Sequence, residues 1–291
     1  MLAEIRELGF EWVELGHNTR ISLLPGIQQA VAAREIKIAS LHNFCPLPIG
    51  VNGMAPDCYL PSSSNDGERD MAIRHTLRTL ECASQVGAKV VVLHLGRVPM
   101  RFPNYPRRLF KMYVEYHVKT PQYEQLRQKC LVARERKKRK YFDQVCRTLD
   151  KVIPQAQRLK VLLGMETRLG FDEIPSEDEA DELLRRYGTE TLSYWYDNAH
   201  AQIKENLGLI KQEEVLERFR GRTAGMHLQD FMPPLDDHLP PGKGQYDFAR
   251  LKPFATDKMI FSWEIHGEWE ASEIAEGARR VRELLEGTSP A

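Results

Sequence analysis

Seven short runs rich in β-branched and aliphatic residues recur along the chain, and helical stretches separate them. The runs cover residues 11–15, 37–42, 89–95, 161–166, 192–197, 223–228 and 259–265. Strands rich in Val, Ile and Leu that alternate with helices are typical of a parallel sheet covered by helices. The chain has 291 residues, and a (β/α)8 barrel needs roughly 250. The sequence therefore predicts an α/β fold, a TIM (β/α)8-type barrel that forms a single domain over residues 1–291.

Two helices have clear boundaries, and one segment interrupts the alternation. A helix is expected over 67–87, and another over 176–188 that begins at the capping residue Ser176 and ends at Gly188. Residues 97–135 show weak periodicity, which predicts an insertion in a βα loop, followed by a long helix over about 122–158. The basic run "RERKKRK" within that helix predicts a solvated helix face, with a phosphate or nucleic-acid contact as the alternative.

The start of the chain predicts an incomplete barrel. The stretch "MLAEIRELG" is helix-like and precedes the first strand, so strand one of an eight-stranded barrel is lacking. Unpaired strand edges favour association with another chain. The insertion, a partner chain or residues upstream of a misassigned start codon would cover these edges, and a homodimer is one expected outcome.

Composition argues against several classes of partner, although a local basic patch is still possible. Lys plus Arg and Asp plus Glu both number 41, so the formal charge is zero and the chain has no general attraction to nucleic acid or anionic membranes. No apolar run reaches the roughly 18 residues of a membrane span. Five cysteines, an odd number with no C-x-x-C pair, and an N-terminus without an apolar signal segment predict a reduced, cytoplasmic protein.

Ionisable residues gather at the ends of the predicted strands. The carboxyl ends of barrel strands form the rim where active sites lie, and six of the seven carry such a residue: His42, His94, Glu166, Asp197, His227 and Glu264. Each residue alone has a plain structural explanation: a strand-end histidine is often only hydrogen-bonded, Asp197 would cap the next helix, and Glu264 would pair with an arginine. Because an unpaired buried charge is costly, a divalent cation that binds several of them explains the whole set better.

The motifs around these residues resemble those of a known family. They are "GFEWVEL", "GAKVVVLHLG", "LLGMETR", "YDNAHA", "GMHLQD", "DDHLPPGKGQYDF" and "WEIHG". Together they resemble the xylose isomerase-like TIM barrels, which include sugar-phosphate isomerases, ketose 3-epimerases, inosose-processing enzymes and endonuclease IV. The resemblance extends over nearly the whole chain outside 97–135. The loop "PPGKGQYDF" is expected to be a tight rim turn, which either lets backbone approach a ligand or is an ordinary βα turn.

The epimerase branch of the family implies a site with one cation. Its ligands would be Glu166, Asp197, His227 and Glu264, and the cation Mn²⁺, Mg²⁺, Co²⁺ or Zn²⁺. Glu166 and Glu264 would also be the catalytic acid and base, which move a proton next to a carbonyl through an enediolate. The expected substrate is a small sugar or sugar phosphate, and its contacts would be His200, His94, Arg168 and Lys243.

The endonuclease branch implies a different activity. There the extra ligands His42, His94, His200, Asp236 and His238 would hold further zinc ions for phosphodiester hydrolysis. A third interpretation is a barrel without catalytic activity, which the lacking strand favours and the complete set of four ligands opposes. Because the net charge is zero, the sequence favours the metal-dependent sugar isomerase or epimerase over an enzyme that acts on DNA.

Overall fold

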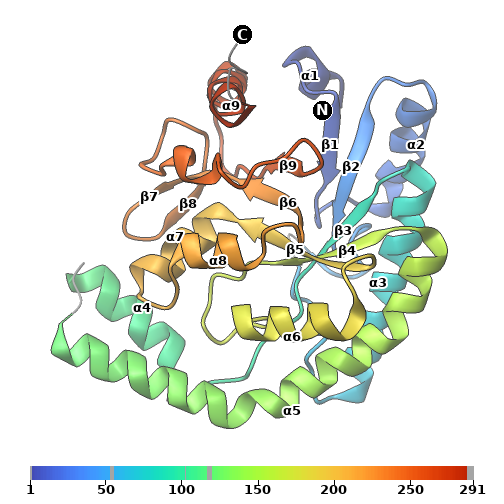
Figure 1. The fold of residues 1–291 in the computed structure, drawn as a ribbon. Coiled ribbons are helices and arrows are strands. Elements are labelled where there is room, and N and C mark those ends of the chain that lie inside the picture. Colours follow the sequence, from blue (N-terminus) through green and yellow to red (C-terminus); the bar gives the residue numbers. More distant parts are fainter. Residues whose placement is uncertain (1, 53–55, 102, 117–119, 287–291) are drawn as a thin grey trace. The chain divides into compact units, whose positions relative to one another are not determined.

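The computed structural model describes residues 2–52, 56–101, 103–116 and 120–286 (Figure 1). The strands are β1 (Trp12–Leu15), β2 (Lys37–His42), β3 (Val90–Leu93), β4 (Leu162–Glu166), β5 (Leu192–Asp197), β6 (Thr223–Leu228), β7 (Asp230–Met232), β8 (Asp236–Leu239) and β9 (Ile260–Trp263). The α-helices are α1 (Leu2–Glu7), α2 (Leu24–Ala32), α3 (Asp66–Val86), α4 (Tyr105–Tyr116), α5 (Pro121–Leu159), α6 (Glu177–Tyr187), α7 (Asn198–Asn206), α8 (Gln212–Arg218) and α9 (Ala271–Glu286). Two 3₁₀ turns lie at Ile21–Leu23 and Phe248–Leu251.

The chain divides into two compact units. The first unit consists of Met1–Pro99, Ala133–Glu166 and Asp172–Trp195. The second unit consists of Met100–Val132, Thr167–Phe171 and Tyr196–Ala291. Strand β5 starts in the first unit, and its last two residues belong to the second. That the chain forms a single domain stays a prediction.

The first unit is built on a parallel sheet in which β1 to β5 follow in chain order (Figure 1). Its central strand residues, such as Val91, Val92 and Leu163, are fully buried because helices cover the sheet. Helix α3 begins at the cap Asn65 and ends at Gly87, whose φ of 76° suits glycine. Strands that were expected from apolar runs therefore form where the sequence predicts them.

Helix α6 confirms the capping prediction in detail. The Ser176 hydroxyl accepts a hydrogen bond from the Glu179 backbone N–H, and the Glu179 carboxylate accepts one from the Ser176 N–H. This reciprocal pair is a capping box. The helix ends before Gly188, which has a positive φ of 80°.

The second unit contains the parallel pair β6–β9 and the antiparallel hairpin β7–β8. The sequence analysis did not predict the hairpin. Its second strand, "DDHL", has polar or charged residues at three successive positions, whereas a typical strand alternates polar and apolar residues. The hairpin follows β6 almost directly, so it extends the chain at the carboxyl end of that strand.

The insertion is helical, and the long helix that follows it is confirmed. Helix α4 lies within residues 97–135, and α5 extends over 39 residues. The basic run is mostly exposed, as expected, but Arg134 is only 6% exposed. Its guanidinium lies 2.7 Å from the Glu179 carboxylate and also donates to the Glu173 carbonyl, 2.9 Å away. The prediction of a wholly solvated face is wrong at this residue because a helix distant in sequence supplies its partner.

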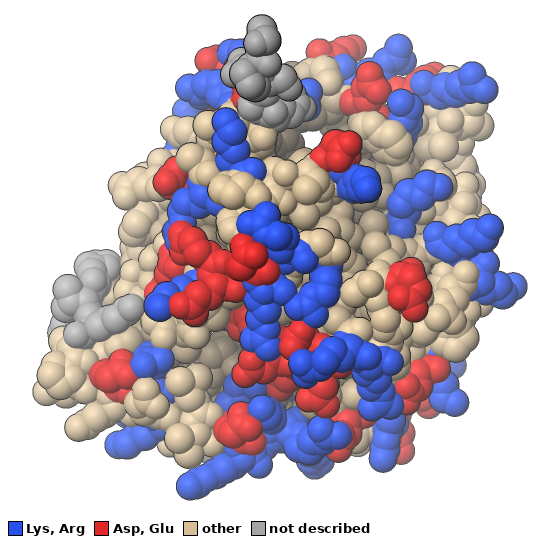
Figure 2. Space-filling model, in the orientation of Figure 1, with Lys and Arg blue, Asp and Glu red and all other residues tan. Residues whose placement is uncertain are grey.

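The start of the chain, its helices and its cysteines agree with the sequence. Helix α1 is the first described element and β1 the first strand, as predicted; among residues 2–11 the structure has no strand. None of the described helices is long and apolar enough to cross a membrane. All five cysteines are free thiols. Figure 2 shows basic and acidic side chains interspersed on the face in view, in keeping with the balanced composition.

Candidate metal centre

The predicted ligands lie at the carboxyl ends of the parallel strands. His42, Glu166 and Asp197 are the last residues of β2, β4 and β5, and His227 is one residue before the end of β6. His94 and Glu264 directly follow β3 and β9. All are buried except Glu264, whose side chain is 17% exposed. His42, His94 and Glu166 belong to the first unit, and Asp197, His227 and Glu264 belong to the second.

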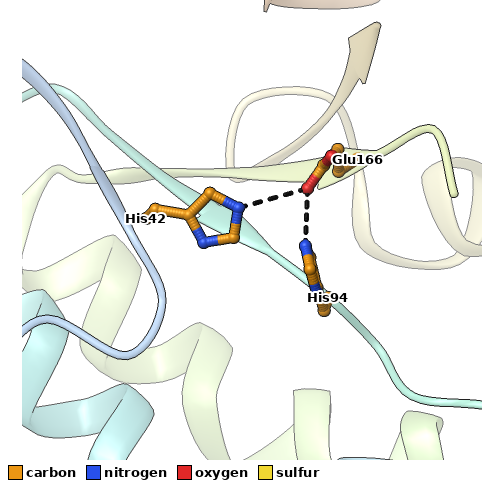
Figure 3. Close-up of side chains that lie close together, drawn as sticks. All are labelled: His42, His94 and Glu166. Carbon is orange, nitrogen blue, oxygen red and sulfur yellow. Dashed lines mark hydrogen bonds and ion pairs between the residues drawn. The ribbon is translucent and has the colours of Figure 1, made fainter. Parts of the chain in front are cut away.

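The three residues of the first unit form one cluster, in which both imidazoles point at the same carboxylate (Figure 3). Glu166 Oε2 lies 2.8 Å from His94 Nε2 and 3.3 Å from His42 Nε2. His42 Nδ1 lies 3.1 Å from the Asn43 carbonyl oxygen. A carbonyl only accepts hydrogen bonds, so His42 Nδ1 carries a proton, and Nε2 is the nitrogen that faces Glu166. Two imidazole nitrogens and a carboxylate oxygen are a donor set that suits Zn²⁺ and related divalent ions.

Three ligands predicted for the epimerase site lie together in the second unit. His227 Nδ1 is 3.0 Å from Glu264 Oε2 and 3.9 Å from Asp197 Oδ2. Ligand atoms that each lie about 2.0–2.2 Å from one ion are separated by such distances. The residues present therefore fit a divalent cation. The addition of Glu166 from the first unit as fourth ligand stays a prediction.

Asp197 also caps a helix, which was the alternative explanation for it. Its Oδ1 accepts a hydrogen bond of 2.8 Å from the His200 backbone N–H at the start of α7. Its Oδ2 accepts one of 2.7 Å from Gln229 Nε2. Gln229 is itself fixed, because its backbone exchanges hydrogen bonds of 2.9 and 2.8 Å with the Asn198 side chain. A carboxylate has about four lone-pair positions, so the cap and Gln229 orient Asp197 and still leave it able to bind a cation.

The expected substrate contacts belong to different local settings. His200 Nδ1 lies 3.0 Å from the Thr167 carbonyl oxygen, so Nδ1 carries the proton and Nε2 can accept a hydrogen bond. Arg168 follows β4 and is 7% exposed. Lys243 forms an ion pair with Glu273 of α9, which supplies the counter-charge that a phosphate would otherwise provide. None of these contacts tests the binding roles, which stay predictions.

The extra ligands of the endonuclease interpretation differ in exposure. Asp236 is exposed, whereas the His238 side chain is only 15% exposed. His238 Nδ1 donates a hydrogen bond of 2.8 Å to Asp237 Oδ1, and its Nε2 lies 3.8 Å from Glu264 Oε2. Burial alone would lower the pKa of His238, but the hydrogen bond with Asp237 and the charge of Glu264 raise it above the ordinary value. The His266 ring stacks on His238 with centroids 3.9 Å apart and planes 2° from parallel. One ion cannot lie in the planes of two stacked rings, so this arrangement lets only one of them bind it.

The rim loop is organised by an acidic residue of the "GMHLQD" motif. The Asp230 carboxylate accepts hydrogen bonds of 2.8–2.9 Å from four backbone N–H groups, those of Phe231, Gly242, Gly244 and Tyr246. A Cβ on Gly244 would lie 2.5 Å from both Asp230 Oδ1 and the Phe231 carbonyl oxygen. The glycine is therefore needed for the approach of this loop to Asp230, which favours the turn interpretation over a loop that opens its backbone to a ligand.

Several residues close to these clusters were not predicted from the sequence, among them His17, Gln229 and His266. His17 is 9% exposed and lies edge-on to His42 with ring centroids 5.0 Å apart. It follows β1 by two residues, so the strand-end rule that selected the other histidines would have found it. Gln229 is neutral and gave no charge signal, and His266 lies two residues beyond Glu264.

The comparisons with known proteins agree with this architecture. The family model described as xylose isomerase-like TIM barrel matches residues 2–286. No curated protein matches the chain. A solved structure of 3-keto-D-glucoside 4-epimerase, YcjR, from E. coli has a TM-score of 0.66 and 16% identity, over 97% of this chain and 92% of that one.

Two further solved structures are similar to the same extent. A D-tagatose 3-epimerase-like protein has a TM-score of 0.67 and 17% identity, over 97% of this chain and 91% of that one. D-Psicose 3-epimerase with D-tagatose from Clostridium cellulolyticum H10 has a TM-score of 0.63 and 13% identity, over 98% and 92%. At such identities the likeness shows the fold, and it confirms the predicted TIM-barrel class. Because the family model matches residues 2–286, nearly the whole of this chain, the chain belongs to the xylose isomerase-like TIM barrel family.

Proposed function

We propose that the protein is a divalent-metal-dependent isomerase or epimerase of a sugar or sugar phosphate. The observation that carries the proposal is the cluster of Asp197, His227 and Glu264 at the carboxyl ends of β5, β6 and β9. Glu166, at the end of β4, is proposed as the fourth ligand. The solved structures with the same fold include enzymes named as sugar epimerases, which supports this class of substrate.

The two glutamates are proposed to transfer the proton. When bound, the cation supplies Lewis-acid stabilisation of the negative charge that develops on the substrate after proton removal. Glu264 or Glu166 removes the proton from the carbon next to the carbonyl, and the other returns a proton from the opposite side. Which of them acts as base depends on the configuration of the substrate carbon. Two carboxylates on opposite sides permit inversion at one carbon, which a single base does not.

Neighbouring side chains are proposed to orient the substrate. His200 keeps Nε2 as an acceptor for a substrate hydroxyl because its Nδ1 is held at the Thr167 carbonyl. Arg168 and His94 are proposed as further polar contacts. Lys243 would contact a phosphate group only by exchanging its ion pair with Glu273, so a phosphorylated substrate is expected to compete with that pair.

A multi-zinc phosphodiesterase is the second candidate, and one observation favours it. His42 and His94 form a second donor set together with Glu166, and the proposed epimerase site uses neither histidine as a metal ligand. The balanced charge of the chain opposes a DNA substrate, since DNA-binding proteins usually carry an excess of basic residues.

Metal analysis of variants separates the two candidates. The metal-free protein is loaded separately with Mn²⁺, Co²⁺ and Zn²⁺, its metal content is measured, and it is assayed with ketoses and with abasic DNA. The epimerase proposal expects ketose activity that Asp197→Asn abolishes and that needs one ion per chain. Cleavage of abasic DNA that needs two or three ions, and that His42→Ala abolishes, would replace it with the hydrolase. Glu217→Gln, at an exposed surface pair, is the control and should leave either activity unchanged.

A further inference from the structure

Asp57, an acidic residue outside every motif, contacts His94 at the ring nitrogen that does not face Glu166. The Asp57 Oδ1 atom lies 2.9 Å from His94 Nδ1, while His94 Nε2 lies 2.8 Å from Glu166 Oε2. The His94 ring is thus held between two carboxylates, one on each nitrogen. Asp57 lies 37 positions before His94 in the sequence, in the segment between β2 and α3.

The hydrogen bond to Asp57 determines which ring nitrogen of His94 carries the proton. An ionised carboxylate only accepts hydrogen bonds, so His94 Nδ1 must carry the proton. The nitrogen that faces Glu166 is Nε2, as it is in His42. With the proton held on Nδ1, Nε2 is the nitrogen that can give its lone pair to a cation. A histidine that binds a metal through one nitrogen typically donates the other N–H to a carboxylate or carbonyl, which fixes both tautomer and ring orientation.

Asp57 is itself held in place. Its Oδ2 accepts a hydrogen bond of 2.5 Å from the Arg97 guanidinium, and its side chain is 25% exposed. The backbone of Arg97 is fixed in turn by Ser62, whose hydroxyl accepts from the Arg97 N–H at 2.9 Å and donates to the Arg97 carbonyl at 3.0 Å. A carboxylate that is anchored by an arginine in this way loses little freedom when it binds His94, which suits a role in orientation.

We propose that Asp57 is a positioning residue that fixes the tautomer and orientation of His94 so that Nε2 can bind a divalent cation together with Glu166 and His42. The inference rests on the metal dependence of the proposed function and adds a cation site at His42, His94 and Glu166, in which His94 is a ligand and not a substrate contact. Asp57 takes no part in the proton transfer. Removal of such an outer partner typically weakens metal binding 10–100-fold.

The test measures zinc affinity by titration against a competing chelator. Asp57→Ala is expected to bind Zn²⁺ about 10–100-fold more weakly than the unchanged protein. Asp57→Asn should lose less, because the amide oxygen still accepts the His94 Nδ1–H. In the His94→Ala background, Asp57→Ala should cause no further loss, since Asp57 acts only through that ring. Visible absorption of bound Co²⁺ should change in Asp57→Ala, which a purely structural role would not cause.

A matched control and a metal-free measurement keep the two proposals apart. Glu173→Gln removes another carboxylate near Arg97, 3.8 Å away, and should leave zinc affinity unchanged. In the metal-free protein, nitrogen-15 NMR should show a hydrogen-bonded Nδ1 proton on His94 that Asp57→Ala abolishes. An unprotonated Nδ1, equal zinc affinity in Asp57→Ala, or additive losses in the double variant would overturn the role of Asp57. Failure of the unchanged protein to bind any divalent ion would contradict the proposed function, and the NMR result would still decide the role of Asp57.

Discussion

Replacement of Asp230 by Asn should release the rim loop without unfolding the protein. The buried carboxylate accepts two backbone N–H groups at each oxygen: Phe231 and Tyr246 at Oδ1, Gly242 and Gly244 at Oδ2. An asparagine places an NH2 group where one oxygen was, so two N–H groups lose their acceptor and face another donor. Hydrogen bonds to charged groups contribute about 1.5–3 kcal/mol each. The loss should therefore be about 3–6 kcal/mol, concentrated in residues 240–248.

Hydrogen exchange followed by mass spectrometry measures this effect directly. Peptides that cover 240–248 should exchange much faster in Asp230→Asn than in the unchanged protein, while peptides from β2 to β4 should keep their protection. Asp247→Asn is a suitable control because Asp247 is exposed and caps only one N–H, that of Ala249 at 3.1 Å; its effect should stay near 1 kcal/mol. Unchanged protection of the loop in Asp230→Asn would refute the reasoning.

Three other changes test separate parts of the structure. Glu264→Gln should keep the thermal midpoint near that of the unchanged protein and lose nearly all turnover; retention of most activity would exclude Glu264 from catalysis. Arg134→Ala should destabilise the protein by about 3–5 kcal/mol in urea unfolding, because it leaves the buried Glu179 carboxylate without its guanidinium; a loss below about 1 kcal/mol would contradict this. Burial and the charge of Glu173 raise the pKa of Asp172 from 3.8 to about 6. Since the folded state holds this proton more tightly than the unfolded state, its contribution is present below pH 3.8 and is lost as the pH rises through 6. Asp172→Asn should therefore stabilise the protein above pH 6, by up to about 3 kcal/mol, and have little effect near pH 4; equal effects at both pH values would be the contrary result.

Local patterns explain why the strands and helix ends could be predicted from the sequence. Strand β3 buries a continuous run of Val and Leu, and Ser176 and Gly188 mark the two ends of α6 through local hydrogen bonds and backbone conformation. The hairpin β7–β8 was not predicted because its charged residues form neither an apolar run nor an alternation of polar and apolar residues. Arg134 was assigned to a solvated face because its partner Glu179 lies 45 positions away and only the packing of α5 on α6 brings them together.

In the candidate site, too, residues in a local pattern could be predicted and residues brought in by tertiary contacts could not. Strand-end position selected His42, His94 and Glu166, and the structure brings these three side chains together. Asp57 and Gln229, which orient His94 and Asp197, follow no periodic pattern and were not found. Sequence position thus identified the residues that meet at strand ends, whereas the residues that orient them depend on tertiary contacts.

Solvent deuterium uptake tests the central claim most directly. The protein is loaded with Mn²⁺ or Co²⁺ and incubated in heavy water with a panel of ketoses, and the sugars are analysed by proton NMR. The proposed mechanism predicts deuterium at the carbon next to the carbonyl of a substrate, at a rate that depends on the metal and is lost in Glu264→Gln. No exchange into any ketose, together with metal-dependent cleavage of abasic DNA, would contradict the isomerase proposal in favour of a phosphodiesterase.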